Sequence, residues 1–258
     1  MVGSRKKPAL TQDFFVKFSN PDRLEAPDRT FVGHRDIVTR SLARYHFVAS
    51  HLQGATLDVG CGRGYGFDVI QPWSSRRVGI DVSLEFLRDA QARSSAASLV
   101  RASGEALPFS RGSFESIIAF EVIEHIENDL AFLDELKRLV RDDGLIAIST
   151  PNKRISSGNT DQPLNPFHTR EYTFTEFQKL LDGVFSTVIL FGQHEGGTNR
   201  SSINHWIDRI PIQWKYLLPV YIQGLISVTL RPPLRLEDCR FKTDDLELAH
   251  TFLALCRP

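Results

Sequence analysis

The sequence predicts an α/β fold in which a mostly parallel sheet has helices on both faces. Short apolar segments typical of strands alternate along the chain with segments of helical periodicity, and this alternation is the signature of parallel sheets. A turn rich in glycine joins the first strand to the helix that follows it. The chain has 258 residues, a length that suits one large α/β domain or two small ones.

The first half of the chain supplies most of the predicted alternation. Apolar residues recur at helical spacing over residues 33–52, and Gln53-Gly54 ends that helix. Ser83 is a plausible N-cap for one of the later helices. The strands expected here are 56–59, 77–80, 97–101 and 114–120, and the helices are 64–70 and 83–92.

The second half continues the pattern up to residue 191. An amphipathic helix over 130–140 is expected to stop at a turn formed by Asp142, Asp143 and Gly144, and residues 145–149 form the next strand. Thr173 and Glu176 have the spacing of a capping box that opens a helix to Leu181. The final strands are predicted at 184–191 and 251–256.

Two segments depart from this alternation. Residues 1–32 are polar and are interpreted as an N-terminal arm before a single α/β domain over 33–258. Residues 194–250 lie between the last two strands and are too long for a simple connection, so they are interpreted as an inserted lid or substrate region. Within them, the aromatic and apolar stretch 206–226 suits a lid, a dimer contact or a peripheral membrane contact.

Composition restricts the class of protein. The formal net charge is +0, whereas nucleic-acid-binding proteins usually carry a basic surplus, so a nucleic-acid partner is not expected. The three cysteines, Cys61, Cys239 and Cys256, are scattered and form neither a disulfide framework nor a zinc motif. No secretory signal and no transmembrane segment is evident, which favours a cytoplasmic protein with reduced thiols.

The strongest local signal is the run LDVGCGRG at residues 57–64. Glycines 60, 62 and 64 allow a tight turn and close approach of a ligand to the backbone. The dinucleotide fingerprint GxGxxG needs glycine at position 65, which is Tyr65 here, so a dehydrogenase is disfavoured. Asp58 would repel a pyrophosphate but attract a cation such as S-adenosylmethionine (SAM), which carries a sulfonium and an ammonium.

A second acid, Asp81, ends the next strand in Val78-Gly79-Ile80-Asp81. An acid at this place accepts hydrogen bonds from both ribose hydroxyls of a nucleoside ligand in other sheets of this kind. The alternative is that Asp81 only caps the helix that follows.

Five segments occur in the order and spacing of class I SAM-dependent methyltransferases, and the chain resembles that family: LDVGCGRGYG, GIDVS, GEALPF, FESIIAFEVIEHI and RDDGLIAISTPN. The resemblance implies a Rossmann-like sheet of seven strands with the last one antiparallel, and makes 33–258 a methyltransferase domain. It places Asp58, Gly60, Gly62 and Gly64 at the methionine part of SAM and Asp81 at the ribose.

The resemblance also points to the adenine side of the cofactor. Many relatives have an acid before the Leu-Pro-Phe segment, and this chain has Ser103 at that position. Ser103 or the backbone of Gly104 and Glu105 is therefore expected to contact adenine.

Glu121, Glu124 and His125 follow the strand 114–120, where loops of a parallel sheet line the ligand crevice. Glu121 is expected to contact SAM or the methyl acceptor, and His125 suits a general base for an oxygen acceptor. The alternative is that Glu124 and His125 cap or brace the following helix. His168, in the segment NPFHTREYTFTEF, is the third candidate on the acceptor side. The alternative is that His168 and Arg170 form hydrogen bonds with the Thr173 cap.

The Glu-x-x-Glu-His spacing also resembles the metal-binding element of small-RNA 3′-terminal 2′-O-methyltransferases. Glu121, Glu124, His125 and His168 would then hold a divalent metal that activates a hydroxyl. The same string is similar to that of bacterial methyltransferases of ubiquinone biosynthesis and of polysaccharide-associated type.

The expected function is therefore SAM-dependent methyl transfer to a small-molecule or glycan-type acceptor at oxygen. The alternatives are a metal-assisted RNA 2′-O-methyltransferase and a non-catalytic SAM-binding protein. The sequence leaves the acceptor and the oligomeric state open.

Overall fold

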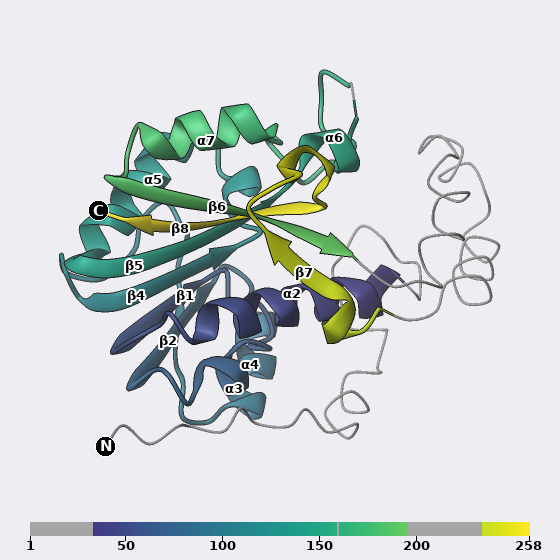
Figure 1. Ribbon diagram of the computed structural model, residues 1–258. Coiled ribbons are helices and arrows are strands. Elements are labelled where there is room, and N and C mark those ends of the chain that lie inside the picture. The colour runs from purple at the N-terminus through teal and green to yellow at the C-terminus, as the bar shows by residue number, and fades with distance from the viewer. Residues whose placement is uncertain (1–32, 159, 196–233) are drawn as a thin grey trace, which may run out of the picture.

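The computed structural model describes residues 33–158, 160–195 and 234–258. Within these residues, one sheet holds eight strands in the order β3-β2-β1-β4-β5-β8-β6-β7 (Figure 1). The strands are β1 Ala55–Val59, β2 Arg76–Asp81, β3 Ser98–Arg101, β4 Phe114–Phe120, β5 Val140–Pro151, β6 Thr187–Glu195, β7 Cys239–Lys242 and β8 Thr251–Arg257.

The first five strands pair in parallel, and β8 runs antiparallel to both of its neighbours, β5 and β6. The predicted Rossmann-like α/β class and the antiparallel last strand are confirmed. The strand number differs from the expected seven, because β7 pairs antiparallel with Gly192–Glu195, the end of β6. This short strand lies in the segment 194–250, for which the sequence indicated only an insertion.

Helices cover both faces of the sheet (Figure 1). The α-helices are α2 Gly33–Ala49, α3 Phe67–Ile70, α4 Leu84–Arg93, α5 Asp129–Leu139, α6 Lys153–Ser156 and α7 Phe174–Asp182, and the 3-10 helices are η2 Ile123–His125, η3 Leu236–Asp238 and η4 Leu246–Leu248. Helices α5 and α7 pack on one face, and α2, α3 and α4 on the other.

Alternation along the strands divides the apolar residues between two cores. In β4, Ile117 belongs to the core under α5 and α7, whereas Ile118 belongs to the core under α2, α3 and α4. Both side chains are fully buried. A central strand covered on both faces is therefore apolar throughout rather than alternating, as buried parallel strands usually are.

Two predicted helix starts are confirmed, whereas several other boundaries differ: α2 ends at Ala49 rather than at Gln53-Gly54, and β6 covers Thr187–Glu195 rather than 184–191. Ser83 caps α4 and accepts a hydrogen bond from the Phe86 amide, and the capping box of Thr173 and Glu176 opens α7. The helix predicted at 64–70 begins only at Phe67, because Gly64 has a φ of +74°, outside the helical region.

The turn predicted at residues 142–144 is wrong. Helix α5 ends at Leu139, and β5 begins at Val140, which pairs with Phe114. The ladder then shifts register between Phe114 and Ser116, so the extra residues form an irregularity inside the strand. Gly144 fits there because a β-carbon would lie 2.8 Å from the Glu115 carbonyl oxygen.

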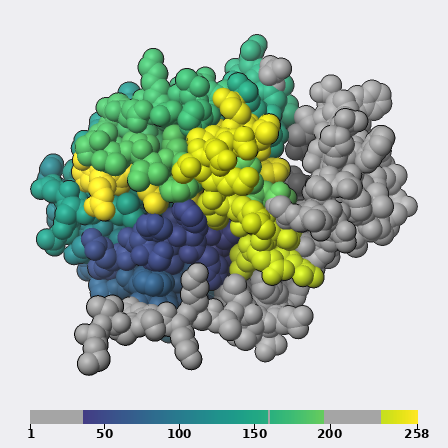
Figure 2. Space-filling view, viewed as in Figure 1, coloured from purple at the N-terminus to yellow at the C-terminus, as the bar shows by residue number. Residues whose placement is uncertain are grey.

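Helix α2 adjoins the C-terminal part of the chain in the space-filling view (Figure 2), and polar contacts join the two. Asp36 accepts a hydrogen bond from the Leu234 amide at 3.0 Å, and the Arg40 guanidinium pairs with Glu195 at the end of β6. Arg44 donates to Gln193 Oε1 at 2.9 Å, and Gln193 donates in return to the Arg40 carbonyl. These contacts place the buried face of α2 beside the carboxyl ends of β1 and β4.

Burial along α5 gives a test of the core. Leu136 is fully buried, whereas Leu130 on the same helix is 52% exposed. We expect Leu136→Ala to lower the free energy of unfolding by about 2–5 kcal/mol, since it removes packed methyl groups and leaves a cavity. Leu130→Ala should change it by less than about 0.5 kcal/mol. Urea unfolding followed by circular dichroism measures both, and equal losses would contradict the placement of α5.

Candidate active site

The carboxyl ends of neighbouring parallel strands meet at one edge of the sheet. Strands β2, β1, β4 and β5 are adjacent and run in the same direction. Asp81 ends β2, Asp58 lies near the end of β1, Glu121 follows β4, and Thr150 lies near the end of β5. In open α/β sheets this edge is where ligands bind.

The glycine turn after β1 combines left-handed backbone with close packing. Gly60, Gly62 and Gly64 have φ values of +69°, +53° and +74°. A β-carbon at Gly60 would lie 2.5 Å from Val122 Cγ2, so the turn packs closely against the segment after β4. At Gly62 a β-carbon would meet nothing within 4 Å. The turn therefore leaves open space at Gly62, where a ligand can approach the backbone.

Asp81 joins this turn to the start of α4. Its two carboxylate oxygens accept hydrogen bonds from the Gly62 amide at 2.9 Å and the Ser83 amide at 2.8 Å. The N-cap of α4 is Ser83, so Asp81 is not the helix cap that the sequence left as an alternative. A carboxylate oxygen accepts more than one hydrogen bond, and Asp81 thus retains capacity for a ligand hydroxyl.

Asp58 is almost fully buried, at 1% exposure. The Tyr45 hydroxyl, from α2, lies 3.1 and 2.9 Å from its two oxygens. Burial, and to a smaller extent the Asp81 charge, raises the pKa of Asp58 to about 7, while the Tyr45 hydrogen bond lowers it. The charge of Asp58 beneath the turn therefore varies around neutral pH.

The predicted adenine segment follows β3 and lies at the surface. Ser103 and Glu105 are exposed, and the Ser103 hydroxyl accepts a hydrogen bond from the Glu105 amide at 3.3 Å. The Ala102 amide donates to the Asp81 carbonyl oxygen. That bond holds the segment beside the end of β2, where Asp81 lies.

Glu121 has a φ of +55°, in the left-handed region that residues other than glycine seldom adopt. Its amide donates to the Ser149 carbonyl and its carboxylate accepts from the Ser149 hydroxyl at 2.8 Å. The buried Arg44 guanidinium lies 3.9 Å from the same carboxylate oxygen. Strained backbone that is held by hydrogen bonds is typical of functional sites. Here the left-handed conformation of Glu121 turns the chain toward η2.

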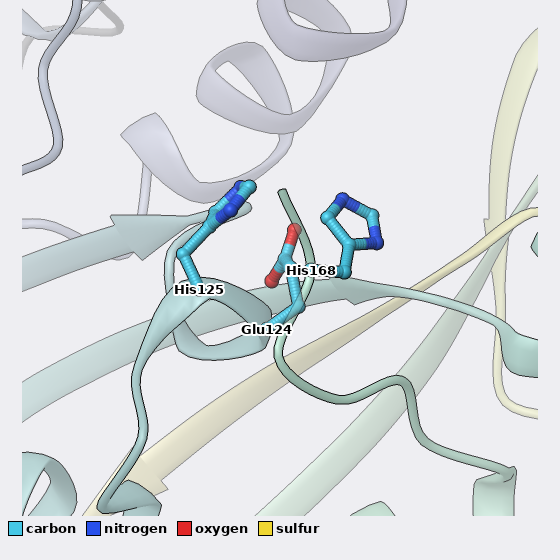
Figure 3. A group of neighbouring side chains, drawn as sticks. All are labelled: Glu124, His125 and His168. Carbon is cyan, nitrogen blue, oxygen red and sulfur yellow. The ribbon is translucent and has the colours of Figure 1, made fainter. Parts of the chain in front are cut away.

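Glu124, His125 and His168 lie together beyond the ends of β4 and β5 (Figure 3). One potential ligand atom from each lies within 4.8 Å of those of the other two. Burial raises the pKa of Glu124 well above its usual range. Partial burial lowers the pKa of His125, although its side chain reaches solvent. Glu121, expected as a fourth ligand, is not a member of this group; its carboxylate accepts from the Ser149 hydroxyl and lies near Arg44.

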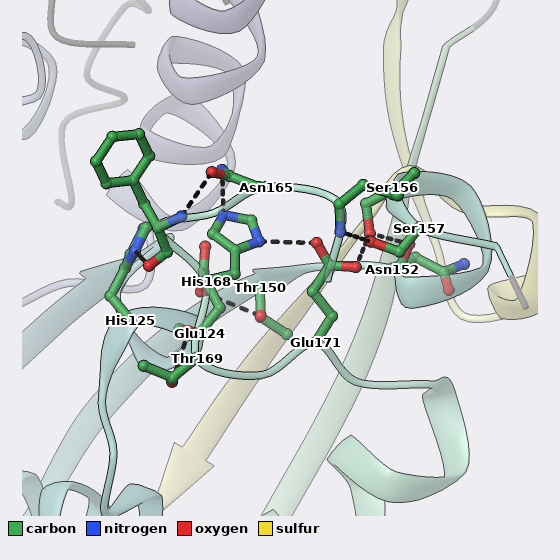
Figure 4. A network of polar contacts seen from close by, with 12 residues as sticks. Glu124, His125, Thr150, Asn152, Ser156, Ser157, Asn165, His168, Thr169 and Glu171 are labelled. Carbon is green, nitrogen blue, oxygen red and sulfur yellow. Dashed lines mark hydrogen bonds and ion pairs between the residues drawn. The ribbon is translucent and has the colours of Figure 1, made fainter. Parts of the chain in front are cut away.

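A hydrogen-bond network surrounds the group (Figure 4). His125 Nδ1 lies 2.8 Å from the Phe167 carbonyl oxygen, and His168 Nδ1 lies 2.8 Å from Glu171 Oε1. Glu124 Oε2 accepts from the Thr150 hydroxyl at 3.1 Å. Two segments far apart in sequence, η2 and the loop before α7, thus form one site.

The capping alternatives for these residues are not observed. The N-cap of α5 is Asn128, so Glu124 and His125 do not cap that helix. The Thr173 cap is completed by Glu176, whereas His168 contacts Glu171 and Arg170 pairs with Asp129. Glu124 does brace the loop before α7, but through its carbonyl oxygen, which accepts from the Thr169 amide.

Sequence reasoning missed three residues of this edge. The sequence pattern indicates Tyr45 only as part of an apolar helix stripe and Ser149 only as a strand residue, and it suggests no role for Glu171. Their contacts with Asp58, Glu121 and His168 join distant segments, and no spacing in the sequence signals such pairs. The N-terminal arm and the apolar stretch 206–226 lie outside the described residues.

Comparison with known proteins identifies the domain. Residues 57–148 match the methyltransferase domain family. A probable SAM-dependent methyltransferase of Mycolicibacterium smegmatis is 36% identical over 126 residues, 49% of each chain. A ubiquinone biosynthesis O-methyltransferase of Parvibaculum lavamentivorans is 29% identical over 105 residues, 39% of this chain and 42% of the relative. The chain spans about half the length or less of these curated relatives.

The fold is shared with solved methyltransferase structures. A SAM-dependent methyltransferase from Thermotoga maritima, described as a possible histamine N-methyltransferase, superposes with a TM-score of 0.57 at 13% identity. The match covers 86% of this chain and 91% of that one. Family match, relatives and fold together show that the chain contains a class I SAM-dependent methyltransferase domain.

Two further expectations can be compared with the described residues. The three cysteines are free thiols, as expected. No helix among the described residues is long and apolar enough to cross a membrane.

Asp81 gives the first test of the cofactor site. We expect Asp81→Ala to weaken SAM binding at least about tenfold, since it removes an anionic hydrogen-bond acceptor and loosens the Gly62 amide. Asp68→Ala, at an exposed acid on α3, is the matched control and should leave the affinity unchanged. Isothermal titration calorimetry measures both, with circular dichroism as a check of folding. Equal affinities in the two variants would place the ribose elsewhere.

Asp58 predicts a pH dependence of SAM binding. Below its pKa of about 7 the carboxyl is neutral, and above it the carboxylate attracts the sulfonium. The affinity should therefore rise as pH increases through this value, by up to about tenfold, a change of 1.4 kcal/mol. Asp58→Asn is the control, because its side chain has the same shape but does not titrate. Its pH profile then contains only the titration of other groups, such as the SAM amino group. Parallel pH profiles for the two proteins would contradict the assignment.

Proposed function

We propose that this chain transfers the methyl group of SAM to a hydroxyl of a small-molecule or glycan-type acceptor. The observation that carries the proposal is the position of His125. His125 lies just after β4, and β4 is the neighbour of β1, the strand that precedes the glycine turn. The Nδ1–H of its ring donates to the Phe167 carbonyl oxygen. The Nε2 lone pair is thereby left for an acceptor proton.

The residues at the turn fit SAM as the methyl donor. Open space at Gly62 and the partly satisfied Asp81 carboxylate suit a ribose and a methionine chain. When bound, SAM supplies an electrophilic methyl group on a sulfonium. Methyl transfer is an in-line displacement with a neutral leaving group, so alignment of the two reactants provides most of the rate enhancement.

The proposed step transfers one methyl group and one proton. The acceptor oxygen forms a bond to the methyl carbon, the carbon–sulfur bond breaks and its electron pair stays on the thioether product, and the hydroxyl proton passes to His125 Nε2. An oxygen acceptor agrees with the ubiquinone O-methyltransferase among the relatives. The balanced charge of the chain disfavours a polyanionic acceptor such as RNA.

We expect His125→Gln to lower turnover by about 10²–10⁴-fold, the usual contribution of a general acid or base, with little change in SAM affinity. His51→Gln, at an exposed histidine after α2, should retain full turnover. Release of labelled methyl groups onto a panel of phenols, sugars and RNA oligonucleotides measures both. A fully active His125→Gln protein would refute the proposed role of His125. Methylation of RNA alone would show that the acceptor is RNA rather than a small molecule or glycan.

A further inference from the structure

Two imidazoles and one carboxylate converge at the end of the sheet beyond β4 and β5. Glu124 and His125 come from η2, and His168 comes from the loop before α7, 43 residues farther along the chain than His125. Their candidate ligand atoms lie within 4.8 Å of one another. Figure 3 shows the three side chains directed toward a common space.

The hydrogen bonds of both rings fix which nitrogen faces that space. A carbonyl oxygen only accepts, so His125 Nδ1 donates its proton to Phe167. His168 Nδ1 likewise donates to the Glu171 carboxylate, which also accepts from the Ser156 hydroxyl. Each Nε2 therefore carries a lone pair. Histidines that bind metals usually have their other nitrogen held in this way by a carboxylate or a backbone carbonyl.

The carboxylate provides an independent observation. Glu124 is 1% exposed, and its Oε2 accepts from Thr150, but its Oε1 is a buried atom without a hydrogen-bond partner among the described residues. Leaving a buried carboxyl oxygen without a hydrogen-bond partner is costly. In this position the oxygen is next to two imidazole nitrogens, so a cation would satisfy it.

We propose that Glu124 Oε1, His125 Nε2 and His168 Nε2 bind one divalent transition-metal cation. Two imidazole nitrogens and one carboxylate oxygen suit Zn²⁺, Fe²⁺ or Ni²⁺ better than Mg²⁺ or Ca²⁺, which prefer oxygen donors. The Asn165 amide donates to His168 Nε2 at 2.8 Å in this structure. It must turn away when the cation binds.

Three protein ligands leave coordination positions open for the acceptor. A hydroxyl oxygen on the cation would lose its proton to solvent more readily and attack the methyl carbon as an alkoxide or phenolate. With the cation bound, His125 contributes as a ligand instead of as the proton acceptor. This catalytic role rests on the proposed methyl transfer, whereas the binding of the cation does not.

Titration calorimetry of the metal-free protein with Zn²⁺, without SAM or acceptor, tests the site directly. We expect one tight site in the wild type and a loss of at least about 100-fold in affinity for Glu124→Gln and for His125→Gln. Glu171→Gln removes no ligand but frees the His168 ring, and should weaken binding about 10–100-fold. Glu127→Gln, at an exposed glutamate three residues from Glu124, is the matched control and should bind as the wild type does.

Asn165→Ala removes the competing amide and should leave the affinity equal or higher. Adventitious zinc binding elsewhere would instead leave the affinity of Glu124→Gln and His125→Gln at the wild-type value. If Glu124→Gln does not fold, His125→Gln and Glu171→Gln carry the test. No binding in the wild type, or wild-type affinity in both of these variants, would overturn the proposal. Zinc binding without methyl transfer would retain the site and refute only the proposed function.

Discussion

The parallel pairing of β2, β1, β4 and β5 is the constraint on which the rest of the structure depends. Because these strands run in one direction, residues from four separate parts of the sequence meet at a single edge. Two apolar cores, one on each face, hold the strands in register and leave their carboxyl ends free for polar side chains. Rigid strands thus carry a site whose individual residues lie on turns.

The edge divides into two regions of different chemistry. At β1 and β2 it presents open glycine backbone and two carboxylates, which suit a cationic nucleoside such as SAM. At β4 and β5 it presents histidines and acids around η2. Glu121 joins the two regions, and its left-handed backbone is held through Ser149 and approached by Arg44 of α2. Helix α2 therefore contacts both regions, because Arg44 lies near Glu121 and the next residue, Tyr45, donates a hydrogen bond to Asp58.

The sequence predicted those features that depend on local chemistry. Alternating periodicity gave the order of strands and helices, and the capping residues Ser83 and Thr173 gave the starts of two helices. The glycine turn and Asp81 were predicted because tight turns and acids at strand ends need particular residue types at short spacing. The turn at 142–144 failed because pairing of Val140 with Phe114 overrides the local signal.

Tertiary structure alone decided which distant side chains meet. The sequence by itself determined the class of fold and the glycine turn, because both follow from patterns within a few residues. It proposed His168 beside Glu124 and His125 only by resemblance, and it had no means of finding Glu171, Tyr45 or the contact of Arg44 with Gln193. Those pairs arise because loops and helices from separate segments are brought to one edge by sheet packing. Contacts of this kind depend on burial and hydrogen bonding that no local spacing encodes.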